Sequence, residues 1–257
     1  MTTDSAEPGR TPTPPTGLLR RNAAALVGGA ASTLGVILAG SWLAGRSEGG
    51  LQAEILVALG GAVVWVSIAA PLLAARGRTV IDRLLRGGVV IDAAGVALLV
   101  VAGGLVVRGR VGFTWIDALQ AYCVLLTVGL TGLGVVSLGR SEMSRFALAM
   151  LSAVGAVTML ATPFWVEGML QEALTADSHQ LAAFATLWNP FYSLSATVEY
   201  SWSYADWMYG ISGLGEDVPA PPVYWHSAVV RYALSAGVVW AAVGVAGLVR
   251  RRKGSAA

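Results

Sequence analysis

Six long apolar stretches constrain the fold of this chain more than any other feature. They cover residues 22–45, 52–75, 88–107, 116–139, 146–165 and 227–249. A helix needs about 20 mostly apolar residues to cross a bilayer, and each stretch reaches that length. Leu, Ala, Val and Gly dominate them, without the polar alternation of a barrel strand. We therefore expect an all-α, polytopic membrane protein with six transmembrane helices.

Charged side chains are too scarce for a water-soluble globule. Only 12% of the 257 residues are charged and 55% are hydrophobic, so polar side chains could not cover the surface of such a globule. The single cysteine, Cys123, excludes an intrachain disulfide. Residues 1–17, rich in Pro, Thr and Ser, are expected to form a disordered cytoplasmic tail. Residues 254–257 form a second tail, which leaves 18–253 as one membrane domain.

Positive charge is distributed unevenly between the predicted loops. With the amino terminus inside, thirteen of the seventeen Lys and Arg residues lie on the inner side, whereas Arg46, Arg108 and Arg110 lie outside. Lys and Arg in short loops are retained on the cytoplasmic side. The predicted localisation is therefore the cell membrane, with several passes and both termini in the cytoplasm.

The region 166–226, between the last two spans, is the only long connection. It holds seven acidic residues, no Lys or Arg, and eleven of the twenty-one aromatic residues. The charge places it outside the cell, and Trp and Tyr are favoured where a chain lies at a membrane–water interface. We expect the function of the protein to involve this external region.

Two short helices are predicted within the external region. Asp177 and Ser178 interrupt the first, and Asn189 ends it, because a residue before proline is pushed out of the helical region. Pro190 suits the first position of the second helix. Both are too short to span, so they are either interfacial or re-entrant. The residues predicted to lie at the external interface are Trp188, Asn189, Pro190, Trp202 and Trp207.

The connection after the second span reads RGRTVIDRLLRG and is the longest cytoplasmic one. Thr79 and Asp82 resemble a capping pair, and the residues from Val80 are expected to form a short amphipathic helix on the membrane surface. Two interpretations stay open: a docking site for a partner, or a basic loop that touches anionic lipid and sets the topology. The basic residues concerned are Arg76, Arg78, Arg83 and Arg86.

Three charged residues lie just inside the outer ends of their spans: Glu54, Asp117 and Arg231. At 1.5 Å rise per residue they share nearly one depth. A charge inside a span is costly unless it pairs, faces a cavity or reaches the interface. We predict that Arg231 pairs with Asp117 or Glu54 in a structural ion cluster. The alternative is that Arg231 snorkels alone among neighbouring aromatic residues.

Signatures of catalysis and cofactor binding are not found. The sequence has neither the P-loop pattern G-x-x-x-x-G-K-S/T nor G-x-S-x-G. His179 and His226 match no metal-ligand spacing, and no span contains a histidine that could hold haem. We expect no catalytic, cofactor-binding or metal-binding residues, no enzymatic activity and no nucleic-acid partner.

The layout resembles the membrane subunits of ABC-type exporters of the type-2 class. The similarity is strongest from about residue 161, in WNPFYSLSA, the Trp- and Tyr-rich stretch after it, a Pro-containing turn and a last span ending in RRRK. The resemblance implies a homodimer or heterodimer with a separate ATP-binding subunit, which docks on a coupling helix at Arg76–Arg86. Family members have a longer amphipathic helix before the first span than residues 16–22 can form.

The leading functional hypothesis is a membrane-spanning subunit of an ATP-driven exporter. The first alternative is a non-transporting membrane protein whose acidic, aromatic external region binds a partner or lipid. A membrane enzyme with an external site is the third. A bundle built from Gly, Ala, Val and Leu suggests membrane lipid as a partner and an amphipathic or lipid-like cargo, without naming one.

Overall fold

The computed structural model describes residues 16–46, 50–110, 112–161, 187–197 and 224–254. These residues form helices and no strand: α1 (Thr16–Ala44), α2 (Gly50–Ala75), α3 (Val80–Val107), α4 (Trp115–Leu138), α5 (Glu142–Leu160), α8 (Pro190–Thr197) and α11 (Trp225–Gly254). All except α8 are long and apolar enough to cross a membrane, six in the described part of the chain. The predicted all-α, polytopic fold is confirmed.

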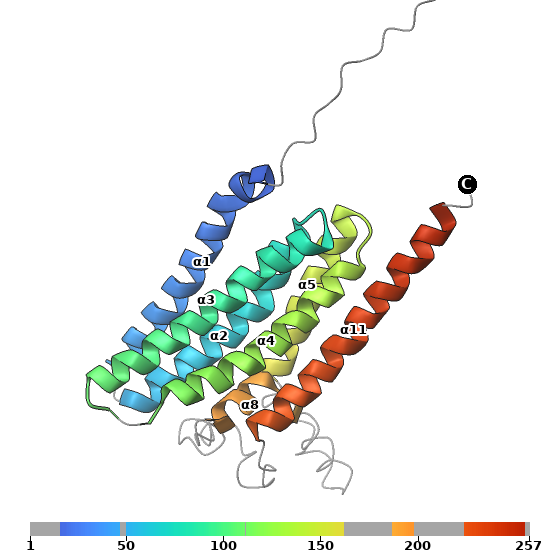
Figure 1. Ribbon diagram of the computed structural model, residues 1–257. Helices are drawn as coiled ribbons and strands as arrows, with labels where there is room; N and C mark the ends of the chain where they lie inside the picture. Colours follow the sequence, from blue (N-terminus) through green and yellow to red (C-terminus); the bar gives the residue numbers. More distant parts are fainter. Residues whose placement is uncertain (1–15, 47–49, 111, 162–186, 198–223, 255–257) are drawn as a thin grey trace, which may run out of the picture.

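Helices α2, α3 and α4 form the centre of the bundle. α1 packs on α2 and α3 at one edge, α11 packs on α4 at the opposite edge, and α5 covers α2 and α4 (Figure 1). In the most apolar part of each span, 56% of the residues of α2, α3 and α4 are buried, against 17% for α1 and α5 and 11% for α11. The outer helices therefore present most of their apolar surface to the membrane.

Small residues bring α3 and α4 together. A Cβ atom at Gly87 of α3 would overlap the side chain of Leu133, and one at Gly129 of α4 would overlap Ile91. Both glycines are buried. Small residues at such positions allow membrane helices to approach closely, so packing rather than polar bonding holds this part of the core.

Side-chain caps begin three of the described spans, α3, α4 and α5. Thr79 accepts from the backbone N–H of Asp82 at the start of α3, which confirms the predicted capping pair. Thr114 and Asp117 form a capping box at α4, and Ser141 forms one with its third helical residue at α5. Each cap stabilises its helix by about 1 kcal/mol. These short polar signals determine where the chain turns between apolar runs.

The cap at Thr79 also corrects one prediction. The residues from Val80 do not form a separate helix on the membrane surface, because they are the first turns of the continuous helix α3. The third span thus begins at Val80 instead of residue 88. Arg83 and Arg86 are only 7% exposed, so packing within the bundle, not contact with lipid, determines the path of these turns.

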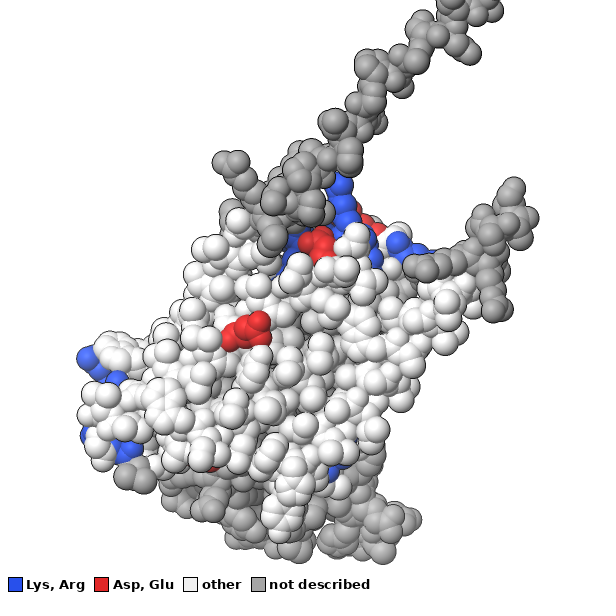
Figure 2. All heavy atoms as spheres, in the orientation of Figure 1, with Lys and Arg blue, Asp and Glu red and all other residues white. Residues whose placement is uncertain are grey.

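The two ends of the bundle differ. The basic end carries the connections 76–79 and 139–141, and the α8 end is the opposite one. Lys and Arg gather towards the ends of the molecule, and the face between them in Figure 2 is almost uncharged. That band of uncharged surface is what a bilayer requires of a spanning bundle.

Helix α8 enters the bundle from its end and does not lie on its surface. Tyr192 is 5% exposed and Leu194 is fully buried, and α8 packs against α2, α4, α5 and α11. Of the two predicted alternatives, interfacial or re-entrant, α8 is re-entrant. The first predicted short helix, Trp202 and Trp207 lie outside the described residues.

Candidate functional site

The basic end is built from two connections with the same local sequence pattern. Residues 77–83 read GRTVIDR between α2 and α3, and residues 139–145 read GRSEMSR between α4 and α5. In each, Gly and Arg precede a Thr or Ser cap, the third helical residue completes the cap, and an Arg follows it. The two hairpins therefore place their arginines in equivalent positions.

The glycine of each pattern is required by the arginine that follows the cap. A Cβ atom at Gly77 would lie 2.6 Å from Cγ of Arg83, and one at Gly139 would lie 2.5 Å from Cγ of Arg145. Real Cβ contacts are never this short, so each arginine stem crosses a space that only glycine leaves open. Both hairpins are consequently closely packed around their arginine stems.

Arg83 connects the two hairpins. Its Nε donates to the carbonyl oxygen of Gly77 at 3.1 Å, and its Nη1 donates to the carbonyl oxygen of Ser137 at the end of α4, at 3.3 Å. Arg86 pairs with Asp82 at 2.9 Å. The two bonds of Arg83 satisfy backbone carbonyls at or just after the carboxyl ends of α2 and α4, where a cation is also favoured by the helix dipole. Arg83 and Arg86 are internal braces.

Among the arginines whose side chains the structure describes, those exposed at the basic end are Arg76, Arg78 and Arg140. Of the four residues predicted to couple to an ATPase, the structure thus exposes Arg76 and Arg78 and buries Arg83 and Arg86. Arg140, from the second hairpin, was not predicted. The repeated G-R-S/T pattern in the sequence was the signal that could have identified it.

The predicted ion cluster of Glu54, Asp117 and Arg231 is not formed among the described residues. Both carboxylate oxygens of Glu54 accept from Nη1 of Arg108, at 3.0 and 3.1 Å. The carboxylate of Asp117 accepts from the backbone N–H of Thr114 at 2.7 Å, within the capping box of α4. Asp117 thus caps its own helix, and Glu54 pairs with Arg108 at the end of α3 instead of with Arg231.

The Trp188–Asn189–Pro190 turn holds the opposite end of the bundle together. Asn189 is 1% exposed, and its Oδ1 accepts from the backbone N–H groups of Phe191 and Tyr192 at 2.9 and 3.2 Å. This bonding caps α8, with Pro190 at the first helical position as predicted. Nδ2 of Asn189 donates to the carbonyl oxygen of Met159 on α5 at 3.0 Å. Asn189 and Pro190 are buried and are not surface residues of an interface.

Two more contacts attach this turn to the spans. Oη of Tyr232 on α11 donates to the carbonyl oxygen of Trp188 at 2.8 Å, and the two rings meet edge to face. The ring of Phe191 packs against α2 at Gly60, where a Cβ atom would lie 3.3 Å from it. The turn thus connects α2, α5, α8 and α11.

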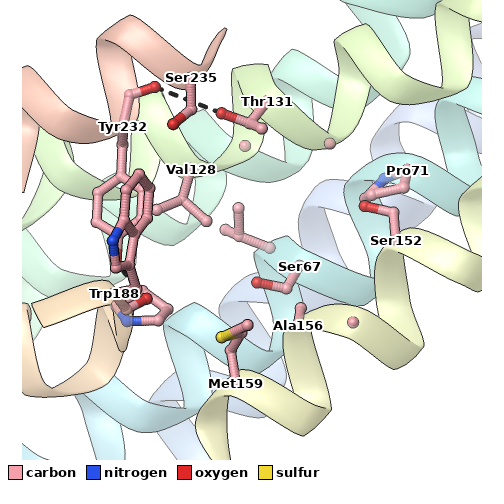
Figure 3. A pocket seen from close by; sticks show the side chains of 15 residues that line it. Ser67, Pro71, Val128, Thr131, Ser152, Ala156, Met159, Trp188, Tyr232 and Ser235 are labelled. Atoms are coloured by element: carbon pink, nitrogen blue, oxygen red, sulfur yellow. Dashed lines mark hydrogen bonds between the residues drawn. The ribbon is translucent and has the colours of Figure 1, made fainter. Parts of the chain in front are cut away.

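A cavity of about 430 Å³ lies beside this turn. Its walls come from α2, α4, α5 and α11, and Trp188 and Pro190 line it next to α8 (Figure 3). Hydroxyl groups reach it from Ser67, Ser152 and Ser235, but none of its described lining residues is charged. Binding pockets for small molecules have volumes of about 300–1,000 Å³, so the cavity is large enough for an apolar ligand.

Asp92 is a candidate that sequence reasoning missed. It lies near the middle of α3, is exposed, and accepts a hydrogen bond from Oη of Tyr122 at 2.6 Å. A carboxylate at this depth is costly on a lipid-facing surface. An acidic residue inside the apolar stretch 88–107 was the sequence signal that could have identified this candidate.

Comparisons with protein-family models, with curated proteins and with solved structures gave no match. Within the described residues, no group of three or more His, Cys, Asp or Glu side chains is arranged to hold a metal ion. Three features are therefore available for a functional interpretation: the exposed arginines of the basic end, the cavity at the Trp188–Asn189–Pro190 turn, and the exposed Asp92–Tyr122 pair.

Proposed function

We propose that this chain is the membrane-spanning subunit of an ATP-driven exporter and that it works with a separate ATPase subunit. The observation that carries the proposal is the basic end, where two hairpins of the same pattern present Arg76, Arg78 and Arg140 on a braced framework. A charged surface of this kind suits the docking of an acidic partner surface, because charge complementarity steers and orients association.

In this proposal a separate subunit supplies the energy of ATP hydrolysis. The sequence carries no P-loop, so the basic end serves to transmit force and not to bind nucleotide. The orientation proposed for this role places the basic end in the cytoplasm, in agreement with the positive-inside rule. Movement of one hairpin would reach the other through the bond between Arg83 and the carbonyl of Ser137.

A second membrane subunit is part of the proposal, as a homodimer or a heterodimer. The exposed Asp92–Tyr122 pair supports it, because a carboxylate in the middle of a span is less costly where another protein surface covers it. The faces of α1, α5 and α11 offer further apolar surface for such an assembly.

The test is purification of the full chain in mild detergent from the membranes of its own organism, followed by measurement of ATP hydrolysis. A wild-type preparation is expected to contain a P-loop protein and to hydrolyse ATP. The triple variant Arg76→Glu, Arg78→Glu, Arg140→Glu is expected to lose most of the P-loop protein and most of the ATP hydrolysis, since reversed charges repel the docking partner. Arg110 is also exposed but lies at the other end, so Arg110→Glu is the control and is expected to retain both the P-loop protein and the ATP hydrolysis.

Two results would contradict the proposal. One is a wild-type preparation with no ATPase activity and no P-loop protein, which would favour a non-transporting interaction protein. The other is equal ATPase recovery from the triple variant and from the control, which would remove the basic end from the docking surface.

A further inference from the structure

We propose that the cavity beside the Trp188–Asn189–Pro190 turn is a binding site for an anionic phospholipid, with one acyl chain in the cavity and the phosphate on Arg231. This binding does not require that the protein transports, so it extends beyond the exporter function. Three features support this assignment: an apolar cavity, the guanidinium group of Arg231 next to it, which is unpaired among the described residues, and the relative depth of the two in the membrane.

The cavity has the chemistry of an acyl-chain site. Its described lining is apolar apart from a few hydroxyl groups and carries no charge. It lies within the membrane-spanning part of the bundle, between the mostly exposed helices α5 and α11. In the described part of the chain these two helices hardly touch, because α11 packs on α4 and α8. A chain from the surrounding bilayer can therefore enter between them.

Ser67 supplies an independent sign of a ligand. It is 6% exposed, and its Oγ is buried without a hydrogen-bond partner among the described residues. Figure 3 shows the hydroxyl pointing into the cavity. A buried polar group is costly when it stays unpaired. A carbonyl oxygen of a lipid ester in the cavity would accept its proton.

Arg231 supplies the charge. Its Nε and Nη2 are buried and have no hydrogen-bond partner in the described part of the chain. It lines a shallow hollow of about 460 Å³ that shares Trp188 and Ser235 with the cavity. An unpaired guanidinium inside a span is costly, and guanidinium groups bind phosphate in a two-point geometry. An oxyanion is the ligand that this position fits.

The relative depth of Arg231 and the cavity matches a lipid in the leaflet at the α8 end. Arg231 lies six residues after Trp225, where α11 begins, which corresponds to about 9 Å along the helix. Ser235, the residue shared with the cavity, lies one turn deeper. A headgroup on Arg231 would therefore have its chain directed towards the middle of the bilayer, as in the membrane itself.

The experiment uses the full chain in nanodiscs of phosphatidylcholine with a trace of phosphatidylglycerol that carries a diazirine within one acyl chain. Light attaches the probe to nearby residues, and peptide mass spectrometry locates the adducts. We expect adducts in 152–159 and 231–239 that saturate with probe and disappear with excess unlabelled phosphatidylglycerol. The same diazirine chain on phosphatidylcholine, in which the choline cation neutralises the charge of the phosphate, is expected to give only unsaturable labelling of exposed faces.

Two positions test the binding of the lipid headgroup and of the acyl chain separately. Arg231→Gln is expected to weaken phosphatidylglycerol labelling about ten-fold or more, because a charge-assisted hydrogen bond is lost, and Arg231→Lys is expected to retain part of it. Gly155→Leu places a side chain at the cavity wall, where a Cβ atom meets nothing within 4 Å, and is expected to abolish saturable labelling. Gly244→Leu, equally open but outside the cavity lining, is the matched control and is expected to label like wild type.

The wild-type comparison decides the proposal even if a variant fails to fold. Equal, unsaturable labelling by the two lipid probes would mean contact with bulk lipid only and would overturn it. Saturable labelling that survives Arg231→Gln would overturn the phosphate assignment, and saturable labelling that survives Gly155→Leu would overturn the assignment of the chain to the cavity.

Discussion

Replacement of Asn189 by alanine is the most informative perturbation of the α8 end. One side chain here caps α8 through two backbone N–H groups and reaches α5 through the carbonyl oxygen of Met159. Asn189 is 1% exposed, so water cannot replace these bonds without rearrangement of the turn. Asn189→Ala should therefore loosen the junction between the spans and the re-entrant helix.

The magnitude follows from the bonds that are lost. Removal of a helix cap costs about 1 kcal/mol, and a buried group that loses its partner costs about 1–3 kcal/mol. We expect Asn189→Ala to lower the free energy of unfolding by about 3 kcal/mol. Asn189→Ser keeps an acceptor for the cap but is too short to reach Met159, so it should recover about 1 kcal/mol of the loss.

The assay is an unfolding titration with sodium dodecyl sulfate in mixed micelles, followed by tryptophan fluorescence. Ser32→Ala is the control, because Ser32 is exposed and bonds only to its own helix, at the carbonyl oxygen of Gly29. It should change stability by less than about 0.5 kcal/mol. If Asn189→Ala is no more destabilising than Ser32→Ala, the turn does not hold the spans together as argued.

Two further predictions concern charge and topology. Arg108→Leu should destabilise the bundle by about 1–2 kcal/mol, because it leaves the buried carboxylate of Glu54 unpaired while Arg108 itself is half exposed. In the same titration, Glu54→Gln added to Arg108→Leu should restore part of the lost stability. The absence of any restoration would argue against the pair. Arg110 and Arg140 are both exposed but lie at opposite ends of the bundle. In a background without Cys123, the cysteine of Arg110→Cys should therefore react with an impermeant thiol reagent on intact cells, and that of Arg140→Cys should not. The reverse labelling would invert the proposed orientation.

Local sequence was sufficient to predict most of the helices and several of their ends. Six apolar stretches became six spans, since length and apolarity alone decide whether a segment can cross a bilayer. The Thr79–Asp82 cap and the break at Asn189–Pro190 were predicted because capping and the restriction before proline act within a few residues. These signals do not depend on what packs against the helix.

Side-chain pairing was not predictable in the same way. Glu54, Asp117 and Arg231 share a depth, but depth says nothing about which way each helix faces. The structure pairs Glu54 with Arg108, uses Asp117 as a cap and leaves Arg231 without a partner among the described residues. Rotation of a helix about its axis is determined by contacts with its neighbours, here the close approach of α3 and α4 at their glycines.

The sequence by itself determined that the chain crosses a membrane as helices and where several of those helices begin, because burial in lipid and capping are properties of single segments. Only the tertiary structure decided that Arg83 and Arg86 face inward and that a cavity lies between α5 and α11. Each of these features depends on which faces of two or more helices meet. That choice depends on packing between residues far apart in the chain, which no local pattern encodes.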